Sequence, residues 1–204
     1  MSSGFENYEG VAAILMQDNI DTDQIIPSRE MKTVSRTGLG TGLFAGARYI
    51  DADARIENPN FVLNRPELEQ ASILVSGTNF GCGSSREHAV WALKEYGFRA
   101  IIAKSFGEIF YGNCLNNGLL PIVLSEPRLE AFDTHLPLSI NLPEQTISSP
   151  AMEGWSATFD IDPYPKRLLL EGLDPIGLTL KSQPRIEDFF RRDASTRPWL
   201  YEAG

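Results

Sequence analysis

The chain has 204 residues, a formal net charge of −9 and two cysteines. A hydrophobic content of 42% is ample for a buried core, yet no apolar run is long enough to span a membrane. The negative charge argues against nucleic acid as the main partner, and two thiols are too few for a disulfide framework. We therefore expect one globular domain in the reducing cytoplasm, without a signal peptide.

The first part of the chain alternates apolar runs with polar connections. Residues 11–16 are predicted to form a buried strand, and the acidic turn formers Asp18 to Asp23 are expected to cap the element that follows. Residues 28–46 contain four glycines and several basic side chains. Long loops of this kind are usually functional or disordered, so we expect either a mobile lid carrying cations over a ligand or a solvated loop.

Residues 71–124 alternate predicted strands and helices. Strands are expected at 71–76, 99–104 and 119–124, with helices at 85–96 and 106–116 between them. Gly97 and Gly118 are placed to end the two helices. Strand–helix–strand units of this length make parallel strand pairs, and such sheets bind ligands in the loops that follow their strands.

Beyond residue 125 the periodicity weakens. Before the alternating strands and helices of 71–124, we expect an irregular or partly helical connection at 51–67. After residue 125, we expect only shorter elements. The shorter elements are strands at 140–142 and 157–161, helices at 167–173 and 186–191, and an aromatic tail at 197–201. That tail is expected to pack back onto the chain or onto a partner.

The stretch Gly77 to His88, GTNFGCGSSREH, connects a predicted strand to a predicted helix. Its glycines allow tight turns and close approach to a ligand, and Ser84-x-x-Glu87 has the pattern of a capping box. A helix start offers free N–H groups and partial positive charge, which favour an anion. The P-loop, the dinucleotide fingerprint and the hydrolase motif Gly-x-Ser-x-Gly are all absent here.

Arg86 is unusual in this position, because a cation in the first turn opposes the helix dipole. A helical wheel also turns it toward the apolar positions Ala89 and Leu93, where a cation needs an anion. An internal ion pair is one explanation. The other is that Arg86, together with the serines and the helix N–H groups, binds a ligand carboxylate or phosphate.

Metal chemistry within this chain is poorly supported. A cubane iron–sulfur cluster needs about three or four thiolates, whereas the chain offers only Cys82 and Cys114. No Cys-x-x-Cys occurs, and His88 and His135 lie far apart in the sequence, which argues against zinc. Both cysteines are expected to be core residues, and no metal site is predicted.

Three motifs together resemble the swivelling domain of the aconitase superfamily: Gly83-Ser-Ser-Arg-Glu-His88, Lys104-Ser-Phe106 and Asn117-Gly-Leu-Leu-Pro121. The stretch Asp18-Asn-Ile-Asp-Thr-Asp-Gln-Ile-Ile-Pro27 narrows the resemblance to the small subunits of 3-isopropylmalate dehydratases. The resemblance implies an α/β swivelling domain, of β/β/α type, with a mixed sheet or barrel flanked by helices. It runs from about residue 11 to the C-terminus, and residues 1–204 are expected to form a single domain, with a helical and aromatic extension from about residue 165.

This resemblance implies a hydro-lyase subunit that is active only with a separate large subunit. The large subunit would carry a [4Fe–4S] cluster, and this chain would bind no cofactor itself. The implied reaction interconverts 2-isopropylmalate and 3-isopropylmalate by dehydration and rehydration in leucine biosynthesis. The expected partners are therefore the large subunit and a small di-acid, without nucleic acid or membrane.

The roles of site residues follow from the same resemblance. Ser84 matches the catalytic base, Arg86 and Ser85 match substrate carboxylate ligands, and Asp23 matches the active-site aspartate. A second substrate arginine matches Arg36 when one residue is inserted, with Arg29 as the alternative. Met31 and Val34 are possible contacts to the substrate side chain.

One conflict and three alternatives stand beside this hypothesis. A Ser84 side chain that caps the helix is not free for catalysis, so we expect Ser85 or the backbone to take over that cap. The nearest alternative is a related dehydratase acting on homoaconitate, citramalate/citraconate or dimethylmalate. A non-catalytic module that binds a di-acid is second, and a self-sufficient hydrolase is third.

Overall fold

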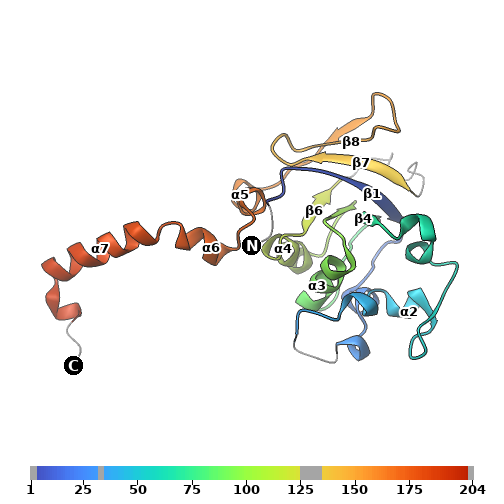
Figure 1. The fold of residues 1–204 in the computed structure, drawn as a ribbon, viewed down its shortest axis with the longest axis horizontal. Helices are drawn as coiled ribbons and strands as arrows, with labels where there is room; N and C mark the ends of the chain where they lie inside the picture. Colours follow the sequence, from blue (N-terminus) through green and yellow to red (C-terminus); the bar gives the residue numbers. More distant parts are fainter. Residues whose placement is uncertain (1–3, 32–34, 125–134, 202–204) are drawn as a thin grey trace.

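A curled, seven-stranded mixed sheet forms the centre of the protein (Figure 1). The computed structural model describes residues 4–31, 35–124 and 135–201. The strand order is β6-β5-β4-β1-β7-β8-β9. β1 (Asn7–Leu15), β4 (Ala71–Ser76), β5 (Ala100–Ala103) and β6 (Leu120–Val123) run parallel, as the sequence pattern predicted. The other edge of β1 continues antiparallel through β7 (Leu136–Asn141), β8 (Thr146–Ser148) and β9 (Ser156–Thr158).

Helices connect and flank this sheet. The parallel strands are joined by α3 (Glu87–Tyr96) and α4 (Glu108–Asn116). The connection between β1 and β4 contains the short helices α1 (Thr22–Ile25) and α2 (Ala45–Arg48) and the hairpin of β2 (Tyr49–Asp51) and β3 (Ile56–Glu57). The chain ends in α5 (Pro163–Glu171), α6 (Pro175–Leu180) and α7 (Gln183–Thr196). Short 3₁₀ turns lie at 28–30, 40–42, 62–64, 66–68 and 198–200.

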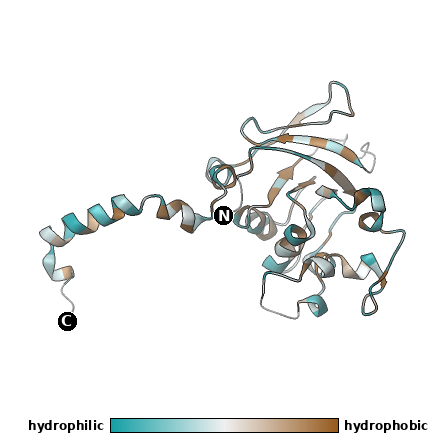
Figure 2. Cartoon of the chain, viewed as in Figure 1, coloured by the Kyte–Doolittle hydropathy of each residue, from teal (hydrophilic) through white to brown (hydrophobic). Residues whose placement is uncertain are grey.

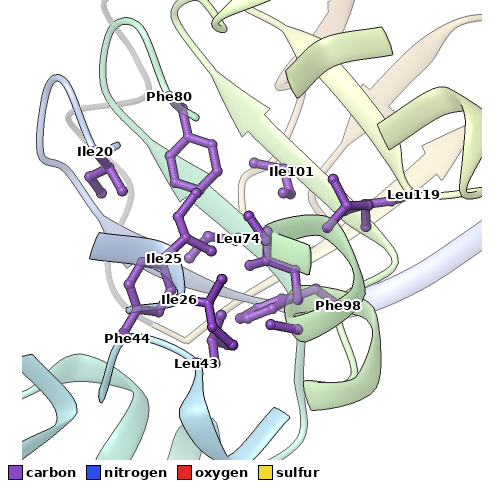
Figure 3. Close-up of a cluster of buried hydrophobic side chains, with 14 of the residues drawn as sticks. Ile20, Ile25, Ile26, Leu43, Phe44, Leu74, Phe80, Phe98, Ile101 and Leu119 are labelled. Carbon is purple, nitrogen blue, oxygen red and sulfur yellow. The ribbon is translucent and has the colours of Figure 1, made fainter. Parts of the chain in front are cut away.

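Two apolar clusters lie on opposite faces of the sheet, because side chains alternate between faces along each strand. On β5, Ile101 packs beneath α1, α3 and α4, whereas Ile102 faces β7 and α5. The helix-covered cluster is shown in Figure 3, where Leu74, Phe80 and Phe98 gather around the strands. Burial on both faces explains why β4 and β5 are continuous apolar runs in the sequence.

Several boundaries differ from those expected. β1 begins at Asn7 rather than at residue 11, and neither β8 nor α6 was expected. α5 ends earlier than the expected helix at 167–173, because Gly172 terminates it in a left-handed conformation with a φ of 63°. Gly97 and Gly118 do follow the two helices, with φ values of 126° and 69°. The glycines therefore marked the helix ends more reliably than the polar residues marked the starts.

The composition of residues 28–46 predicted either a mobile lid or a solvated loop, but only part of this segment is exposed to solvent. Ser35 to Gly38 are exposed, but Leu39, Leu43 and Phe44 are buried in the core. Glu95 of α3 accepts hydrogen bonds from the backbone N–H groups of residues 38, 39 and 40 at 2.5–2.8 Å. Burial raises the pKa of the Glu95 carboxyl, but these three donors together outweigh it and hold the pKa below its ordinary value.

The C-terminal arm, which we define as residues 175–201, projects away from the body (Figure 1). It contains α6, α7 and a final 3₁₀ turn, and neither helix has a buried residue. The predicted helix at 186–191 is confirmed and is longer at both ends. The aromatic tail does pack back, since the Tyr201 and Phe190 rings lie 6.2 Å apart in an edge-to-face arrangement.

Gly81→Ala is expected to lower the free energy of unfolding by about 3 kcal/mol. The backbone at Gly81 has a φ of 73°, which costs an alanine about 1 kcal/mol, and an added methyl would overlap the buried ring of Phe110. Urea denaturation measures the loss. Gly83→Ala is the matched control, since Gly83 also has a positive φ of 89° but its added methyl would lie 3.5 Å from its nearest neighbour. Equal losses in the two variants would contradict the packing argument.

Candidate active site

The glycine loop after β4 is held against the segment that follows β1. The Gly81 N–H donates to the Ile20 carbonyl at 2.7 Å, and the Thr22 N–H donates to the Cys82 carbonyl at 3.0 Å. Asp18 accepts from the Thr78 N–H at 2.6 Å. Both segments follow neighbouring parallel strands, so the sheet brings their loops to one edge.

The acidic segment caps the helix that follows it, as expected. Asp21 is the N-cap of α1, and its side chain accepts from the Gln24 N–H at 2.7 Å. Thr22 is 1% exposed, and its hydroxyl donates to the Ser84 carbonyl at 3.0 Å across 62 residues of sequence. Sequence analysis missed Thr22, whose one signal was its place next to Asp23 in the matched motif.

The predicted capping box does not form. α3 begins at Glu87, the N-cap is Arg86, and no side chain caps it. Arg86 therefore lies before the first turn, and the helical wheel that placed it among Ala89 and Leu93 was wrong. The Ser84 carbonyl accepts from both Thr22 and the Arg86 N–H, the latter at 2.7 Å, which keeps the chain out of the helix at this point.

Glu87, the other half of the expected box, instead contacts Asn117 at the end of α4. The Asn117 side-chain amide donates to the Glu87 carboxylate at 2.7 Å and accepts from the Trp91 indole N–H at 2.9 Å. These bonds fix the first turns of α3 against α4. Asn117 belongs to a matched motif, so its importance was visible in the sequence although its partners were not.

The hydroxyls of Ser84 and Ser85 remain available. Both residues are exposed, and within the described part of the chain neither hydroxyl forms a hydrogen bond. The conflict between capping and catalysis is therefore removed, because the backbone rather than either serine shapes the helix start.

Arg86 pairs with Asp23, from the segment on the neighbouring strand. One guanidinium nitrogen, Nη1, contacts Asp23 Oδ1, and the side chains are 26% and 54% exposed respectively. The Ser28 hydroxyl donates to the same carboxylate oxygen at 3.3 Å. Ser28 was not expected here. The two explanations of Arg86 are therefore compatible. Arg86 forms an ion pair within the chain, and the remaining N–H donors of its partly exposed guanidinium stay accessible to a ligand.

The two candidates for a second substrate arginine have other contacts. The Arg36 guanidinium stacks over the Trp91 ring at 4.9 Å from its centroid, and Arg29 lies 3.7 Å from the Glu30 carboxylate. Among the described residues, neither forms a hydrogen bond or ion pair with Asp23, Ser84 or Arg86.

Met31 and Val34 were the expected contacts to the substrate side chain. Met31 packs partly buried against the helix-covered core, and Val34 lies outside the described residues. Beside Asp23, however, an apolar hollow of about 420 Å³ opens, lined mainly by Leu15, Ile20, Phe44 and Phe61. The sequence had no signal for this hollow, because its lining comes from three separate stretches of the chain, at residues 15–27, 44–47 and 61.

The cysteines do not form a metal centre. Cys114 is fully buried on α4, where burial raises the pKa of its thiol well above the ordinary value, and Cys82 is half-buried in the glycine loop. Within residues 4–31, 35–124 and 135–201, no group of three His, Cys, Asp or Glu side chains is placed to hold a metal. Over the same ranges, no helix combines the length and apolarity that a membrane span requires.

The chain is similar in sequence to proteins of known family. The family described as "Aconitase C-terminal domain" matches residues 2–127. A 3-isopropylmalate dehydratase small subunit from Cupriavidus necator is 51% identical over 207 aligned positions, covering 98% of this chain and 99% of the relative. A protein of the same name from Xanthobacter autotrophicus is 50% identical, covering 96% and 98%.

A solved structure of a 3-isopropylmalate dehydratase from Methanocaldococcus jannaschii has the same fold. It superposes with a TM-score of 0.67 at 31% identity, covering 89% of this chain and 98% of that one. The α/β swivelling fold expected from the motifs is thereby confirmed. The chain belongs to the aconitase superfamily and, within it, to the family of 3-isopropylmalate dehydratase small subunits.

Proposed function

We propose that this chain is the small subunit of an isomerising hydro-lyase that interconverts 2-isopropylmalate and 3-isopropylmalate in leucine biosynthesis. The observation that carries the proposal is the group formed by Ser84, Arg86 and Asp23. The Ser84 hydroxyl has no hydrogen-bond partner among the described residues, and the Arg86 guanidinium uses only part of its donors to bind Asp23. Two relatives named 3-isopropylmalate dehydratase small subunit are 51% and 50% identical to this chain over nearly its full length, which supports the substrate class. The free thiols are consistent with a cytoplasmic protein.

The chain's own residues do not fit an iron–sulfur cluster. Cys114 is enclosed in the core, and Cys82 has no second thiol beside it. The [4Fe–4S] cluster of this enzyme class would therefore reside on the large subunit, as would the activation of the departing hydroxyl. We assign to this chain only carboxylate binding and the exchange of the carbon-bound proton.

Arg86 is suited to grip one carboxylate of a di-acid. Its guanidinium has five N–H donors, and Asp23 contacts it through one edge. The remaining donors can form a charge-assisted pair with a substrate carboxylate, and Ser85 lies next to it in the chain. Asp23 and Ser28 fix the guanidinium before substrate arrives, which reduces the ordering cost of binding.

Ser84 is suited to exchange a proton with the substrate carbon. A serine hydroxyl is a weak base, so its alkoxide must be stabilised by nearby positive charge. Arg86 supplies such charge two residues away, and the uncapped start of α3 adds partial positive charge from its N–H groups. The Thr22 bond to the Ser84 carbonyl holds the backbone that carries this hydroxyl.

The hollow beside Asp23 favours an apolar substrate branch. Its wall combines apolar side chains with the carboxylates of Asp21 and Asp23. A further carboxylate is unfavourable there, because apolar side chains do not solvate its charge and the two aspartates repel it. An isopropyl group suits such a wall better than the additional carboxylate of homoaconitate. Apolar contacts of this kind discriminate by about 1–3 kcal/mol each.

Reconstitution with a cluster-bearing large subunit under anaerobic conditions tests this function. We expect conversion of 2-isopropylmalate to 3-isopropylmalate, with kcat/KM at least about tenfold higher than for homoaconitate, citraconate or dimethylmalate. Preference for one of those substrates would instead identify a related dehydratase. Binding of di-acids without turnover of any of them would identify a non-catalytic module.

A further inference from the structure

The C-terminal arm exposes an unusual amount of apolar surface. Eight large apolar side chains of the arm are 38–70% exposed, including Phe189 at 53%, Phe190 at 50% and Trp199 at 66%. In Figure 2, where the arm stands apart from the body, α6 carries hydrophobic positions in brown, and α7 is mostly hydrophilic with hydrophobic positions between the polar ones. Exposed apolar clusters of this size on a soluble chain mark interaction sites.

The apolar residues of α7 form one stripe. Ile186, Phe189 and Phe190 occupy positions i, i+3 and i+4, which share one face of a helix. Arg191 and Ser195 lie on the opposite face. This spacing is typical of an amphipathic helix that inserts its apolar face into a groove on another protein.

The arm is shaped before any partner binds. Its final turn folds back on α7, where the Tyr201 hydroxyl donates to Asp193 at 2.8 Å and Arg197 pairs with the same carboxylate. At its base, Glu171 of α5 accepts from Lys181 and from Arg167, each at 2.8 Å. Preorganisation of this kind lowers the entropy lost on docking.

Physical stability also points to a missing partner. α7 has 14 residues, and isolated helices shorter than about 12–15 residues are marginal in water. Most helical stability in proteins comes from packing an apolar face, and α7 has no buried residue that could provide it. A surface that covers the stripe would therefore stabilise the helix as well as bind it.

The arm lies outside the domain match that is shared with the superfamily, but a small-subunit relative has most of it. The aconitase domain match ends at residue 127, whereas the relative from Cupriavidus necator matches 98% of the chain, which necessarily includes most of the arm. A feature that accompanies the separate small subunit is expected to serve the association of two subunits. In this family the other chain is the large subunit.

We propose that the arm docks, through Ile186, Phe189 and Phe190, into an apolar groove on the large subunit; this inference rests on the proposed function. The arm then acts as a second attachment beside the surface around Ser84. Because the two contacts are linked, formation of one raises the effective concentration for the other. The surface around Ser84 can therefore bind the large subunit weakly and still remain associated with it.

A second copy of the chain fits the stripe less well. A two-helix pairing needs about three or four heptads of sustained apolar repeat, and α7 provides two. The arm contains five basic and three acidic residues in a chain of net charge −9, so it is the basic part of an acidic subunit. That balance suits a groove with an acidic rim on the partner.

Titration of the large subunit with the full-length chain tests this proposal. Phe189→Ala/Phe190→Ala removes the two aromatic anchors while favouring the helix, since alanine is the strongest helix former. Arg191→Ala/Ser195→Ala is the matched control on the opposite face. Binding is measured by sedimentation, and isomerase activity is measured at each concentration of small subunit.

The aromatic variant is expected to raise the apparent Kd at least about 30-fold, with turnover at saturation unchanged, and the control is expected to stay within about threefold of the original chain. A normal Kd, or a loss of turnover at saturation, would overturn the proposal. The proposal would also be overturned if the original chain self-associates, the aromatic variant is monomeric, and assembly with the large subunit is the same for both. Because binding is measured without substrate, these outcomes are independent of which substrate the complex converts.

Discussion

Ser84→Ala is expected to reduce the turnover of the reconstituted enzyme by a factor of about 10²–10⁴, the range contributed by general acid–base catalysis. The exposed Ser84 hydroxyl forms no hydrogen bond within the described residues, so its removal leaves the packing intact. KM should change little, because Arg86 remains to bind the substrate carboxylate. The measurement is steady-state isomerase activity together with exchange of the substrate's carbon-bound hydrogen for solvent deuterium.

Ser85→Ala separates the two serines. Ser85 is equally exposed but is assigned to the substrate carboxylate, so we expect a rise in KM of up to about tenfold, corresponding to one hydrogen bond. Urea denaturation should show both variants within about 0.5 kcal/mol of the original chain. Near-normal turnover and deuterium exchange in Ser84→Ala would exclude Ser84 as the base.

Arg86→Lys is expected to lower kcat/KM about 100-fold while changing the stability of the small subunit by less than about 1 kcal/mol. Lysine keeps the charge but not the planar fork that can hold Asp23 on one edge and a substrate carboxylate on the other. The Asp23 carboxylate is more than half exposed, so this ion pair contributes little to folding. Activity of the reconstituted complex and urea denaturation of the isolated subunit provide the two measurements.

Arg65→Lys is the control for Arg86→Lys. Arg65 is an exposed arginine on the connection between β3 and β4, and it should leave both activity and stability unchanged. If Arg86 served only as an internal ion pair, its replacement by lysine would lower stability and activity together. A complex containing Arg86→Lys that turned over at the normal rate would refute the substrate-binding role.

Much of the fold could be predicted because the relevant signals are local. The apolar runs at 71–76, 99–104 and 119–124 became β4, β5 and β6 with shifts of no more than one residue. The glycines after α3 and α4 ended those helices because glycine, which has no Cβ, adopts a positive φ at the least cost. The motifs around residues 18–27 and 83–88 further predicted the family, which the comparisons confirmed.

The start of α3 could not be predicted from its own residues. Ser84-x-x-Glu87 satisfies the local rule for a capping box, but Thr22 binds the Ser84 carbonyl and Asn117 binds the Glu87 side chain. These partners lie 62 and 30 residues away in the sequence. Tertiary hydrogen bonds thus replaced the local cap, and this replacement left the Ser84 hydroxyl available.

The sequence by itself determined the order of strands and helices from β4 to β6, the glycine-rich connection after β4 and the placement of serine beside arginine at residues 84–86. Only the tertiary structure decided that Asp23 meets Arg86, that Leu39, Leu43 and Phe44 of the loop at 28–46 lie in the core, and that the C-terminal arm is exposed. The physical reason is range. Helix and strand periodicity reflect bonds between near neighbours, whereas the parallel pairing of β1 with β4 brings loops about 60 residues apart to one edge of the sheet.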